Sequence, residues 1–411
     1  MVSAAPKAGL APLAAARQKV LGCDRCGSCL PVCPLFDVQD VERASARGKN
    51  ALVRGLAEGL LAPGREAQEA LEFCLLCRAC TDACPGKVPT DEAMVQARQA
   101  LADTLGHTPL RSRLIGRTLR RRSLVTLGAA ALTGLRFLGL HRLLPSSLVP
   151  REVSRRSYLA RRAGPALLGA PAPGVPPAVH PTARVAYFQG CGMKLLFPDA
   201  SRSTQRILGG LSAFQRPDHP CCGLPHLAHG QRAAFLELAR ENIRAFEGAD
   251  LVVTDCASCG GTLKHLASWF EGDPEWEGPA ARFAAKVMDL TEYLVAAGYR
   301  PRALPGATFT YHDPCHLARG QGIRRQPRQL LEQAGQLVEL SAKERCCGGS
   351  GSFHLEHPAA AAAILQRKQA DIQGTGAQVV VTACPGCLIQ LTRAADQSGG
   401  AFQALHISQV I

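Results

Sequence analysis

The feature that most constrains this chain of 411 residues is an internal repeat built on cysteines. In each copy, a lone cysteine is followed about thirty residues later by two adjacent cysteines and a glycine, and then by a C-x-x-C pair. Three pairs of landmarks lie 124, 125 and 128 residues apart: Cys191 and Cys315, Cys221 and Cys346, and Cys256 and Cys384. Such a constant period indicates two tandem copies of one structural unit.

Each copy is predicted to alternate strands and helices. Short runs rich in β-branched and aromatic residues end near a cysteine, as in ARVAYFQG before Cys191 and DLVVTD before Cys256. The second copy repeats this before Cys315 and Cys384, and helical segments lie between the runs. Because open parallel sheets place their sites at the carboxyl ends of strands, we expect the lone cysteine and the C-x-x-C pair of each copy to converge.

The first hundred residues carry a different motif, C-x2-C-x2-C-x3-C-P, which also occurs twice. Three cysteines spaced two apart surround one iron–sulfur cubane, while the fourth, followed by proline, binds the other cluster. Structural zinc sites need only two C-x-x-C pairs and leave the third cysteine unexplained. The motif therefore predicts two [4Fe–4S] clusters, the first bound by Cys23, Cys26, Cys29 and Cys84, and the second by Cys74, Cys77, Cys80 and Cys33.

These patterns predict a multidomain chain: an α-helical ferredoxin-type domain followed by two tandem α/β cysteine-rich repeats. We expect the helical domain at 1–106, an arginine-rich connector with a Pro/Ala linker at 107–182, and the repeats at 183–300 and 301–411. All eighteen cysteines fall within the motifs, and the opening residues lack the apolar core of a signal peptide. We therefore expect metal-binding thiolates in a reducing, cytoplasmic compartment rather than disulfides.

The connector carries most of the chain's net charge of +14, because it holds thirteen arginines and one acidic residue, Glu152. No groove-reading motif or aromatic stacking pattern accompanies the arginines, so we do not expect nucleic acid to bind. The segment 120–139 resembles a twin-arginine signal, but it follows a complete domain. Its apolar part, 123–135, is shorter than the roughly 20 residues needed to span a bilayer. It suits peripheral contact with an anionic membrane surface, on the inner face of the cell membrane, or docking onto a partner.

Each repeat offers five cysteines, one more than a tetrahedral zinc ion or a cubane binds. The fifth thiolate would bridge metals, remain as a spare redox-active group, or have no role. The first set is Cys191, Cys221, Cys222, Cys256 and Cys259, and the second is Cys315, Cys346, Cys347, Cys384 and Cys387.

The stretches CCGLPHLAHG with CASCG, and CCGGSGSFH with CPGC, resemble the CCG domains of heterodisulfide reductases. Such domains also occur in iron–sulfur subunits of glycolate and lactate oxidases and of anaerobic glycerol-3-phosphate dehydrogenase. Two cubane motifs followed by two CCG domains resemble the glycolate/lactate type most closely. Both C-x-x-C pairs are complete here, as in the heterodisulfide reductase catalytic subunit. The resemblance implies that each repeat can hold a noncubane [4Fe–4S] cluster, or zinc or [2Fe–2S] in its place.

The chain contains neither G-x-G-x-x-G nor G-x-x-x-x-G-K-[ST], so we expect no flavin or nucleotide on it and no catalytic residue of its own. Oxidation of a hydroxy acid removes two electrons, which requires an organic cofactor such as a flavin. The resemblance thus implies an FAD-containing 2-hydroxy-acid oxidase partner and a quinone or other electron acceptor. Three alternatives stay open: catalytic reduction of a disulfide, the role of iron–sulfur subunit in an anaerobic glycerol-3-phosphate dehydrogenase, and zinc-stabilised docking repeats in which only the cubanes are redox-active.

Three histidines lie near the cysteines of the second repeat: His312, His316 and His354. Since five thiolates suffice to bind a cluster, we expect these side chains to form hydrogen bonds within their loops. The glycines that follow Cys347 are expected to let backbone amides approach cluster sulfurs, which tunes the reduction potential.

Overall fold

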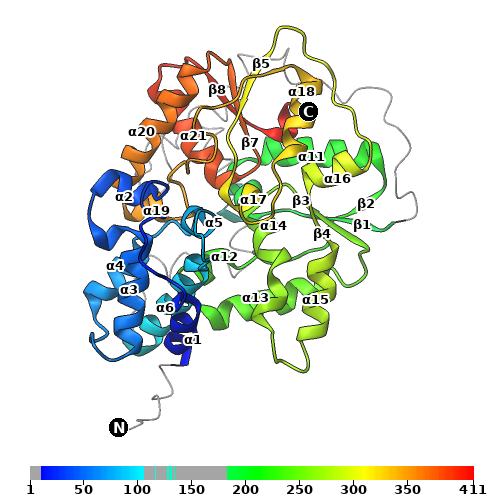
Figure 1. The fold of residues 1–411 in the computed structure, drawn as a ribbon. Helices are drawn as coiled ribbons and strands as arrows, with labels where there is room; N and C mark the ends of the chain where they lie inside the picture. Colours follow the sequence, from blue (N-terminus) through cyan, green and yellow to red (C-terminus); the bar gives the residue numbers. More distant parts are fainter. Residues whose placement is uncertain (1–10, 106–115, 117–126, 129, 132–133, 135–182) are drawn as a thin grey trace. The chain divides into compact units, whose positions relative to one another are not determined.

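The computed structural model describes residues 11–105, 116, 127–128, 130–131, 134 and 183–411 (Figure 1). The arginine-rich connector, including the segment expected to contact a membrane or a partner, lies outside these residues apart from a few isolated positions. Within the described ranges, no helix combines the length and apolarity that crossing a bilayer requires.

The chain forms two compact units. Among the described residues, the first contains 11–105 together with 223–237 and 350–364, which begin at or just after the two CCG motifs. The second contains the remainder of both cysteine-rich repeats.

The N-terminal part of the first unit is helical, as predicted. Its helices are α1 (Ala11–Val20), α2 (Pro34–Gln39), η2 (Glu42–Ala44), α3 (Ala46–Ala57), α4 (Arg65–Glu72), α5 (Ala79–Asp82) and α6 (Thr90–Leu105). Helix α1 packs against α3 and α6. The Ser45 hydroxyl accepts a hydrogen bond from the backbone N–H of Gly48 and so caps α3. The unit also contains α12 (Leu224–Ala228) and α19 (Phe353–Glu356).

The second unit contains two parallel four-stranded sheets of the same topology, β2-β1-β3-β4 and β6-β5-β7-β8 (Figure 1). The strands are β1 (Val185–Phe188), β2 (Phe214–Gln215), β3 (Leu251–Thr254), β4 (Val287–Asp289), β5 (Thr308–Tyr311), β6 (Gln336–Leu337), β7 (Val379–Thr382) and β8 (Gln403–His406). Every residue of the central strands β1 and β7 is buried, as expected for a parallel sheet covered on both faces. The matching strand orders reflect the duplication seen in the sequence.

Helices connect the strands of both sheets. In the first repeat they are α10 (Cys191–Leu196), α11 (Pro198–Leu211), α13 (Arg232–Ala245), α14 (Ala257–Lys264), η4 (Leu266–Trp269), α15 (Glu277–Lys286) and α16 (Leu290–Ala296). In the second they are α17 (Cys315–Ala318), α18 (Arg325–Ala334), α20 (Pro358–Gly374), α21 (Pro385–Gln397) and η5 (Ile407–Gln409). Helices α13 and α20 begin in the first unit and end in the second.

The two repeats pack against each other reciprocally within the second unit. Helix α10 packs on α21 while α14 packs on α17, and α11 contacts η5 while α16 contacts α18. Each contact thus occurs twice with the repeats exchanged, which indicates an approximate two-fold axis between them. Glycine allows the close approach: a Cβ atom added at Gly192 would lie 3.2 Å from Pro385, and one at Gly261 3.2 Å from the His316 carbonyl oxygen.

Strand register determines where the cysteines lie. Phe188 at the end of β1 pairs with Thr254 at the end of β3, so Cys191 and Cys256 follow neighbouring strands at one sheet edge. Strands β5 and β7 bring Cys315 and Cys384 to the equivalent edge of the second sheet. The predicted placement of the lone cysteine and the C-x-x-C pair at strand ends is therefore seen in both repeats.

Candidate metal centres

The first unit contains a cavity whose lining includes four cysteines, Cys33, Cys74, Cys77 and Cys80. Cys33 comes from the first C-x2-C-x2-C-x3-C-P motif and the other three from the second, as the crossed ligand set predicts. Burial, reinforced by the neighbouring thiols, raises the pKa of Cys80 well above the ordinary thiol value. A bound iron–sulfur cluster would offset this cost, because its metal ions stabilise thiolates. The four side chains thus fit a [4Fe–4S] cluster.

Lys49 lines the same cavity and is almost completely buried, with 2% of its surface exposed. Its ammonium group donates hydrogen bonds to the carbonyl oxygens of Arg43 and Ala44, at 3.1 and 2.5 Å. Burial lowers the pKa of Lys49, while the thiols of Cys74 and Cys33 act in the opposite direction. A positive charge beside the cavity suits a cluster whose thiolate ligands make it negative overall.

Arg98 is a second buried cation near Cys74. Its guanidinium donates to the carbonyl oxygens of Leu71, Glu72 and Cys74, the last at 2.8 Å, and to that of Ala228. Burial lowers the pKa of Arg98. The planar guanidinium group of Arg98 therefore restrains the loop that leads into the second cysteine motif.

The other predicted cubane set, Cys23, Cys26, Cys29 and Cys84, comes from two loops that approach each other. A Cβ atom added at Gly86, two residues after Cys84, would lie 3.3 Å from the carbonyl oxygen of Gly22, the residue before Cys23. Burial raises the pKa of Cys29, and the neighbouring thiols of Cys23 and Cys33 act in the same direction. The backbone thus brings the loop of Cys84 to the loop of Cys23, and the assignment of these four cysteines to one cluster stays a prediction.

In the first repeat the lone cysteine lies next to the CCG pair, with Cys191 Sγ 3.6 Å from Cys221 Sγ. The Cys259 thiol contacts those of Cys222 and Cys256, and these contacts, together with burial, raise the pKa of Cys259 well above the ordinary value. Cys256 precedes α14 and its sulfur accepts a hydrogen bond from the backbone N–H of Cys259, at 3.4 Å. Sulfur atoms from three separate segments therefore gather at the end of the first sheet.

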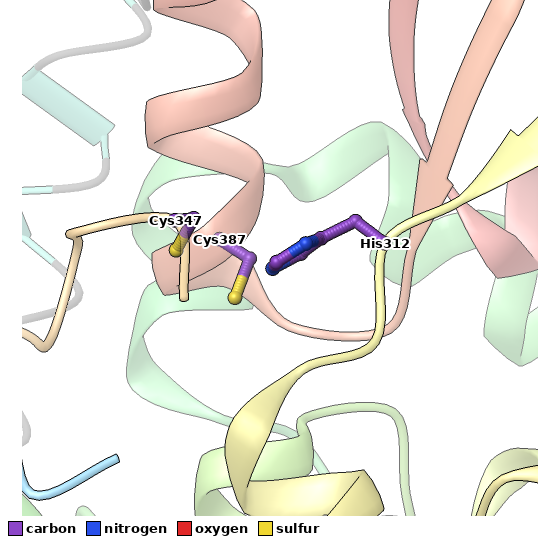
Figure 2. Close-up of side chains that lie close together, drawn as sticks. All are labelled: His312, Cys347 and Cys387. Carbon is purple, nitrogen blue, oxygen red and sulfur yellow. The ribbon is translucent and has the colours of Figure 1, made fainter. Parts of the chain in front are cut away.

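In the second repeat a histidine lies among the sulfurs (Figure 2). The ligand atoms of His312, Cys347 and Cys387 all lie within 4.8 Å of one another, and the three residues are buried. Cys346 and Cys387 donate to the sulfur of Cys347, and together with the nearby His312 imidazole they lower the pKa of the Cys347 thiol well below its ordinary value. Cys384 in turn contacts Cys387.

Cys315 has a different neighbour. Its Sγ lies 3.4 Å from Nδ1 of His316, and the residue is partly exposed. It does not belong to the group that lies within 4.8 Å, which among the described residues contains His312, Cys347 and Cys387.

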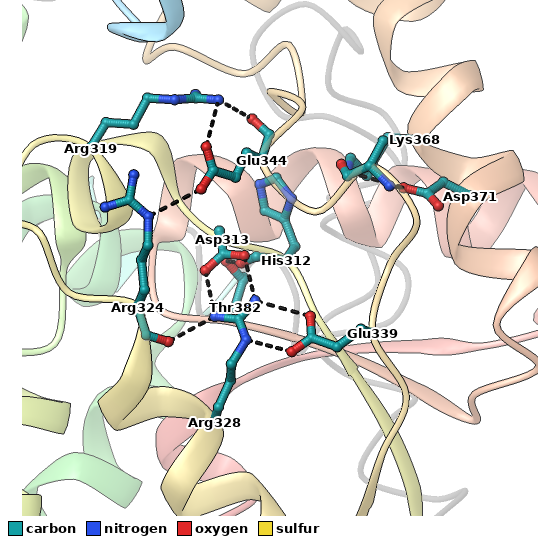
Figure 3. A network of polar contacts seen from close by, with 11 residues as sticks. His312, Asp313, Arg319, Arg324, Arg328, Glu339, Glu344, Lys368, Asp371 and Thr382 are labelled. Carbon is teal, nitrogen blue, oxygen red and sulfur yellow. Dashed lines mark hydrogen bonds and ion pairs between the residues drawn. The ribbon is translucent and has the colours of Figure 1, made fainter. Parts of the chain in front are cut away.

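A polar network holds the His312 loop in place (Figure 3). The buried Asp313 carboxylate accepts two hydrogen bonds from Arg328, at 2.9 and 2.7 Å, and Arg328 also donates to Glu339. These carboxylates raise the pKa of Arg328. The carbonyl oxygen of His312 accepts a hydrogen bond from the Thr382 hydroxyl at 3.2 Å. Both ends of the peptide around His312 are therefore restrained.

The loop that precedes the second CCG motif is restrained in the same way. Arg319 donates to the carbonyl oxygen of Glu344 at 2.6 Å, and Arg324 donates to its carboxylate at 3.1 Å (Figure 3). The buried Lys368 donates to the carbonyl oxygen of Ala342 at 2.7 Å. The backbone that leads to Cys346 is thus held from both sides.

The glycine of each CCG motif has a backbone requirement. Gly223 and Gly348 adopt φ angles of 88° and 79°, which favour glycine. The Gly348 N–H lies 3.4 Å from Cys346 Sγ and donates to it, so the expected approach of an amide to sulfur is seen here. At Gly349 a Cβ atom would lie 2.7 Å from the Gly386 carbonyl oxygen, which also excludes a side chain.

The two groups of sulfurs meet at the two-fold axis. The thiols of Cys256 and Cys384, the first cysteine of each C-x-x-C pair, are in contact. The Ser258 hydroxyl lies 3.2 Å from Cys384 Sγ, and the N–H of Ala257 donates to the carbonyl oxygen of Ala383 at 3.0 Å. The sites of the two repeats are therefore neighbours.

These features define an iron–sulfur protein with a dicluster domain and two cysteine-rich domains. Residues 19–88 match the 4Fe-4S dicluster domain family, and residues 185–264 and 309–392 match the cysteine-rich domain family CCG. A "Probable glycolate oxidase iron-sulfur subunit" of Bacillus subtilis is 31% identical over 96% of this chain and 93% of its own length. The chain belongs to this family of iron–sulfur subunits and is the iron–sulfur subunit of an oxidoreductase complex.

Two further relatives widen the comparison. One subunit of the fumarate reductase (CoM/CoB) of Methanothermobacter marburgensis is 24% identical over 96% of this chain and 72% of its own length. The "Lactate utilization protein A" of Geobacillus kaustophilus is 31% identical over 56% of this chain and 98% of its own length. The resemblance inferred from the cysteine motifs is thereby confirmed.

Sequence reasoning assigns His312 only hydrogen bonds within its loop, whereas the structure places its ring among the sulfurs. Alignment of the two repeats on their lone cysteines gives a signal that could have found it. His312 lies three residues before Cys315, and the equivalent residue of the first repeat, three before Cys191, is Phe188.

Proposed function

We propose that this chain is the electron-transfer subunit of a 2-hydroxy-acid dehydrogenase complex that oxidises lactate or glycolate. An FAD-containing partner subunit removes two electrons from the substrate, and this chain carries them singly to a quinone or similar acceptor. The cavity lined by Cys33, Cys74, Cys77 and Cys80 carries the proposal, because its lining combines thiols from both motifs. The names of the glycolate oxidase and lactate utilization relatives support the choice of substrate class.

In this proposal the eight cysteines of the dicluster domain bind two [4Fe–4S] cubanes in the crossed arrangement, and the ten cysteines of the repeats provide ligands for further metal centres. When bound, the cubanes supply one-electron chemistry. The residues of the chain hold them, exclude water and set the local charge through the buried cations Lys49 and Arg98.

The test uses the anaerobically purified chain with its cognate flavoprotein. Addition of glycolate or lactate should bleach the visible absorption of the clusters and produce the paramagnetic signal of reduced [4Fe–4S]. The chain without the flavoprotein should not respond to either acid, although dithionite should reduce it. If dithionite reduces the clusters but neither acid does so in the complex, the proposed substrate class is wrong.

A second candidate function, reduction of a disulfide, is favoured by one observation. Cys191, Cys221, Cys222, Cys256 and Cys259 gather in the first repeat with an intact C-x-x-C pair, as the heterodisulfide reductase resemblance requires. Turnover of a disulfide with reduced viologen as the electron donor would favour this candidate. If no disulfide is turned over and the hydroxy acid reduces the clusters in the complex, the electron-transfer role is favoured instead.

We also propose that the complex is cytoplasmic and that the arginine-rich connector brings the chain to the inner face of the membrane. Replacement of Arg120, Arg121 and Arg122 with glutamine should weaken binding to anionic vesicles by roughly 1 kcal/mol per residue. High salt should have a similar effect on the wild type. Vesicle co-sedimentation that neither the substitutions nor salt reduces would favour docking onto a partner subunit instead.

A further inference from the structure

The segment 350–364, which follows the second CCG motif, belongs to the same compact unit as the cysteine-lined cavity of the N-terminal motifs. It packs on the loop that leads into the second of these motifs. The ring of Phe73 in this loop lies 5.7 Å from that of Phe353 and 5.0 Å from that of His357, centroid to centroid. A segment from a cysteine-rich repeat therefore completes the surroundings of the loop.

Ser350 gives this segment a direct hydrogen bond to the loop. Its hydroxyl donates to the carbonyl oxygen of Leu75 at 2.7 Å. The φ angle of Ser350 is 37°, in the left-handed region, and glycines surround the residue in the run GGSG. A glycine would adopt this backbone with less strain, so the bond to Leu75 gives a reason for a serine here. The equivalent residue of the first repeat, Pro225, has no hydroxyl to offer.

This hydrogen bond determines which way the next backbone N–H points. In a trans peptide, the C=O of one residue and the N–H of the following residue point in opposite directions. Because Ser350 binds the C=O of Leu75, the N–H of Leu76 points away from Ser350. Arg98 binds the C=O of Cys74 at 2.8 Å and in the same way directs the N–H of Leu75 away from itself.

The N–H groups of Leu75 and Leu76 are available to a group in the cavity. Both residues line it and are buried, with 2% and 8% of their surfaces exposed. Throughout the described part of the chain, no backbone carbonyl oxygen accepts a hydrogen bond from either N–H. Leu76 has a φ angle of 50°, and left-handed residues of this kind help to form the concave N–H sites that many iron–sulfur clusters occupy. Since buried amides need an acceptor, the sulfur atoms of a cluster suit these two groups.

We propose that Ser350 is a positioning residue for the cubane of this cavity: it holds the carbonyl group of Leu75 so that the N–H of Leu76 donates to a cluster sulfur. Such a hydrogen bond stabilises the added negative charge of the reduced cluster and so raises its reduction potential. Ser350 follows Cys347 by three residues, so a residue of the second repeat tunes a cluster of the N-terminal motifs. The inference rests on the proposed function only in requiring a [4Fe–4S] cluster in this cavity.

The experiment is a redox titration of the full chain, purified anaerobically and followed by electron paramagnetic resonance without the flavoprotein. Ser350→Gly suits the left-handed backbone and removes the hydroxyl. It should lower the potential of the cavity's cluster, with a change of about tenfold in the ratio of reduced to oxidised cluster, or about 59 mV. The other cubane should keep its potential. Cys33→Ala, which should lack the cavity's cluster, assigns its signal.

Ser352→Ala is the matched control, because the hydroxyl of Ser352 lies in the same segment but contacts His229, at 2.9 Å. This variant should shift neither potential. Ser350→Asn should restore most of the wild-type potential, since asparagine tolerates the left-handed region and its side-chain amide can donate to Leu75.

A spectroscopic measurement on the wild type keeps the test decisive if Ser350→Gly loses its cluster. In a chain labelled with ¹⁵N-leucine, electron spin echo modulation should show leucine nitrogens coupled to the reduced cluster. The proposal is overturned if this coupling is absent, if Ser350→Gly keeps the wild-type potential, or if Ser352→Ala lowers it equally. Because a chemical reductant is used, these results do not depend on whether glycolate or lactate reduces the complex.

Discussion

The hydroxyl oxygen of Ser258 lies 3.2 Å from the sulfur of Cys384, so a side chain of the first repeat contacts a candidate metal ligand of the second. The equivalent residue in the second C-x-x-C pair is Gly386, which has no side chain to make the reverse contact. The Ser258 hydroxyl can donate to the Cys384 thiolate and stabilise its negative charge.

Ser258→Ala should therefore weaken metal binding in the second repeat, by about tenfold or more, as the loss of a hydrogen bond to a metal ligand commonly does. Competition with a chelator measures this change. Ser258→Thr keeps the hydroxyl and serves as the control. Equal metal retention by the alanine variant and the wild type would show that the contact contributes nothing to the site.

The crossed ligand sets predict which cubane each cysteine supports. Cys33→Ala should remove the cluster of Cys74, Cys77 and Cys80, a loss of about four iron atoms per chain, and leave the other cluster intact. Cys84→Ala should have the reciprocal effect. Mössbauer and electron paramagnetic resonance spectra distinguish the two outcomes. If each variant instead loses the cluster of its own motif, the four cysteines of each motif bind one cluster and the crossed assignment is wrong.

The buried charge of Lys49 should raise the reduction potential of the neighbouring cluster. A unit charge about 6 Å away in a medium of effective dielectric constant about 20 contributes nearly 3 kcal/mol, or roughly 100 mV for one electron. Lys49→Met should therefore lower that potential and leave the other cubane unchanged. A redox titration followed by electron paramagnetic resonance checks this. Lys19→Met, which removes a more exposed lysine paired with Glu92, is the control and should shift neither potential.

Asp289 should make stability depend on pH. Its Oδ1 accepts hydrogen bonds from the N–H and hydroxyl of Thr291, whereas its buried Oδ2 has no partner. Burial raises the pKa of Asp289 to about 7, so the folded chain favours the neutral acid. The contribution of neutral Asp289 to the free energy of unfolding is complete below about pH 4 and is lost as the pH rises through 7. The loss amounts to about 1.4 kcal/mol per unit of difference between the pKa values of Asp289 in the folded and unfolded chain.

Asp289→Asn should flatten this dependence, which urea unfolding at several pH values would show. Asp250→Asn provides the contrasting control. The pKa of Asp250 is lowered to about 2 by hydrogen bonds and charge attraction from Arg184. The Asp250 carboxylate therefore stabilises the folded chain above about pH 4, and this contribution is lost in acid. Asp250→Asn should therefore lower the free energy of unfolding at neutral pH and have little effect in acid. If the free energy of unfolding changes between pH 4 and pH 7 in the same way in the wild type and in Asp289→Asn, Asp289 does not have this role.

Local patterns predict the strands and their cysteines because both are short-range properties of the sequence. The runs before Cys191, Cys256, Cys315 and Cys384 form parallel strands. What local patterns could not reveal depends on contacts between distant segments.

The position of the His312 ring is one example, since it follows from the distance to Cys347 and Cys387, 35 and 75 residues away. The contact between Ser258 and Cys384 is another, because it requires the two repeats to face each other. A third example is the grouping of residues 223–237 and 350–364 with the N-terminal helices. The composition of these segments does not predict this grouping.

The reciprocal packing of the repeats has a consequence for how such a chain evolves. In a symmetric dimer of identical polypeptides, every substitution appears on both sides of the axis, so neither copy can acquire a new residue alone. Here the two halves are encoded separately within one polypeptide, while helix pairs such as α10–α21 and α14–α17 form a reciprocal interface between them. Phenylalanine can therefore occupy position 188 while histidine occupies the equivalent position 312, and serine can occupy position 258 while glycine occupies the equivalent position 386. Fusion of the two copies in one polypeptide therefore allows equivalent positions of the two halves to carry different side chains.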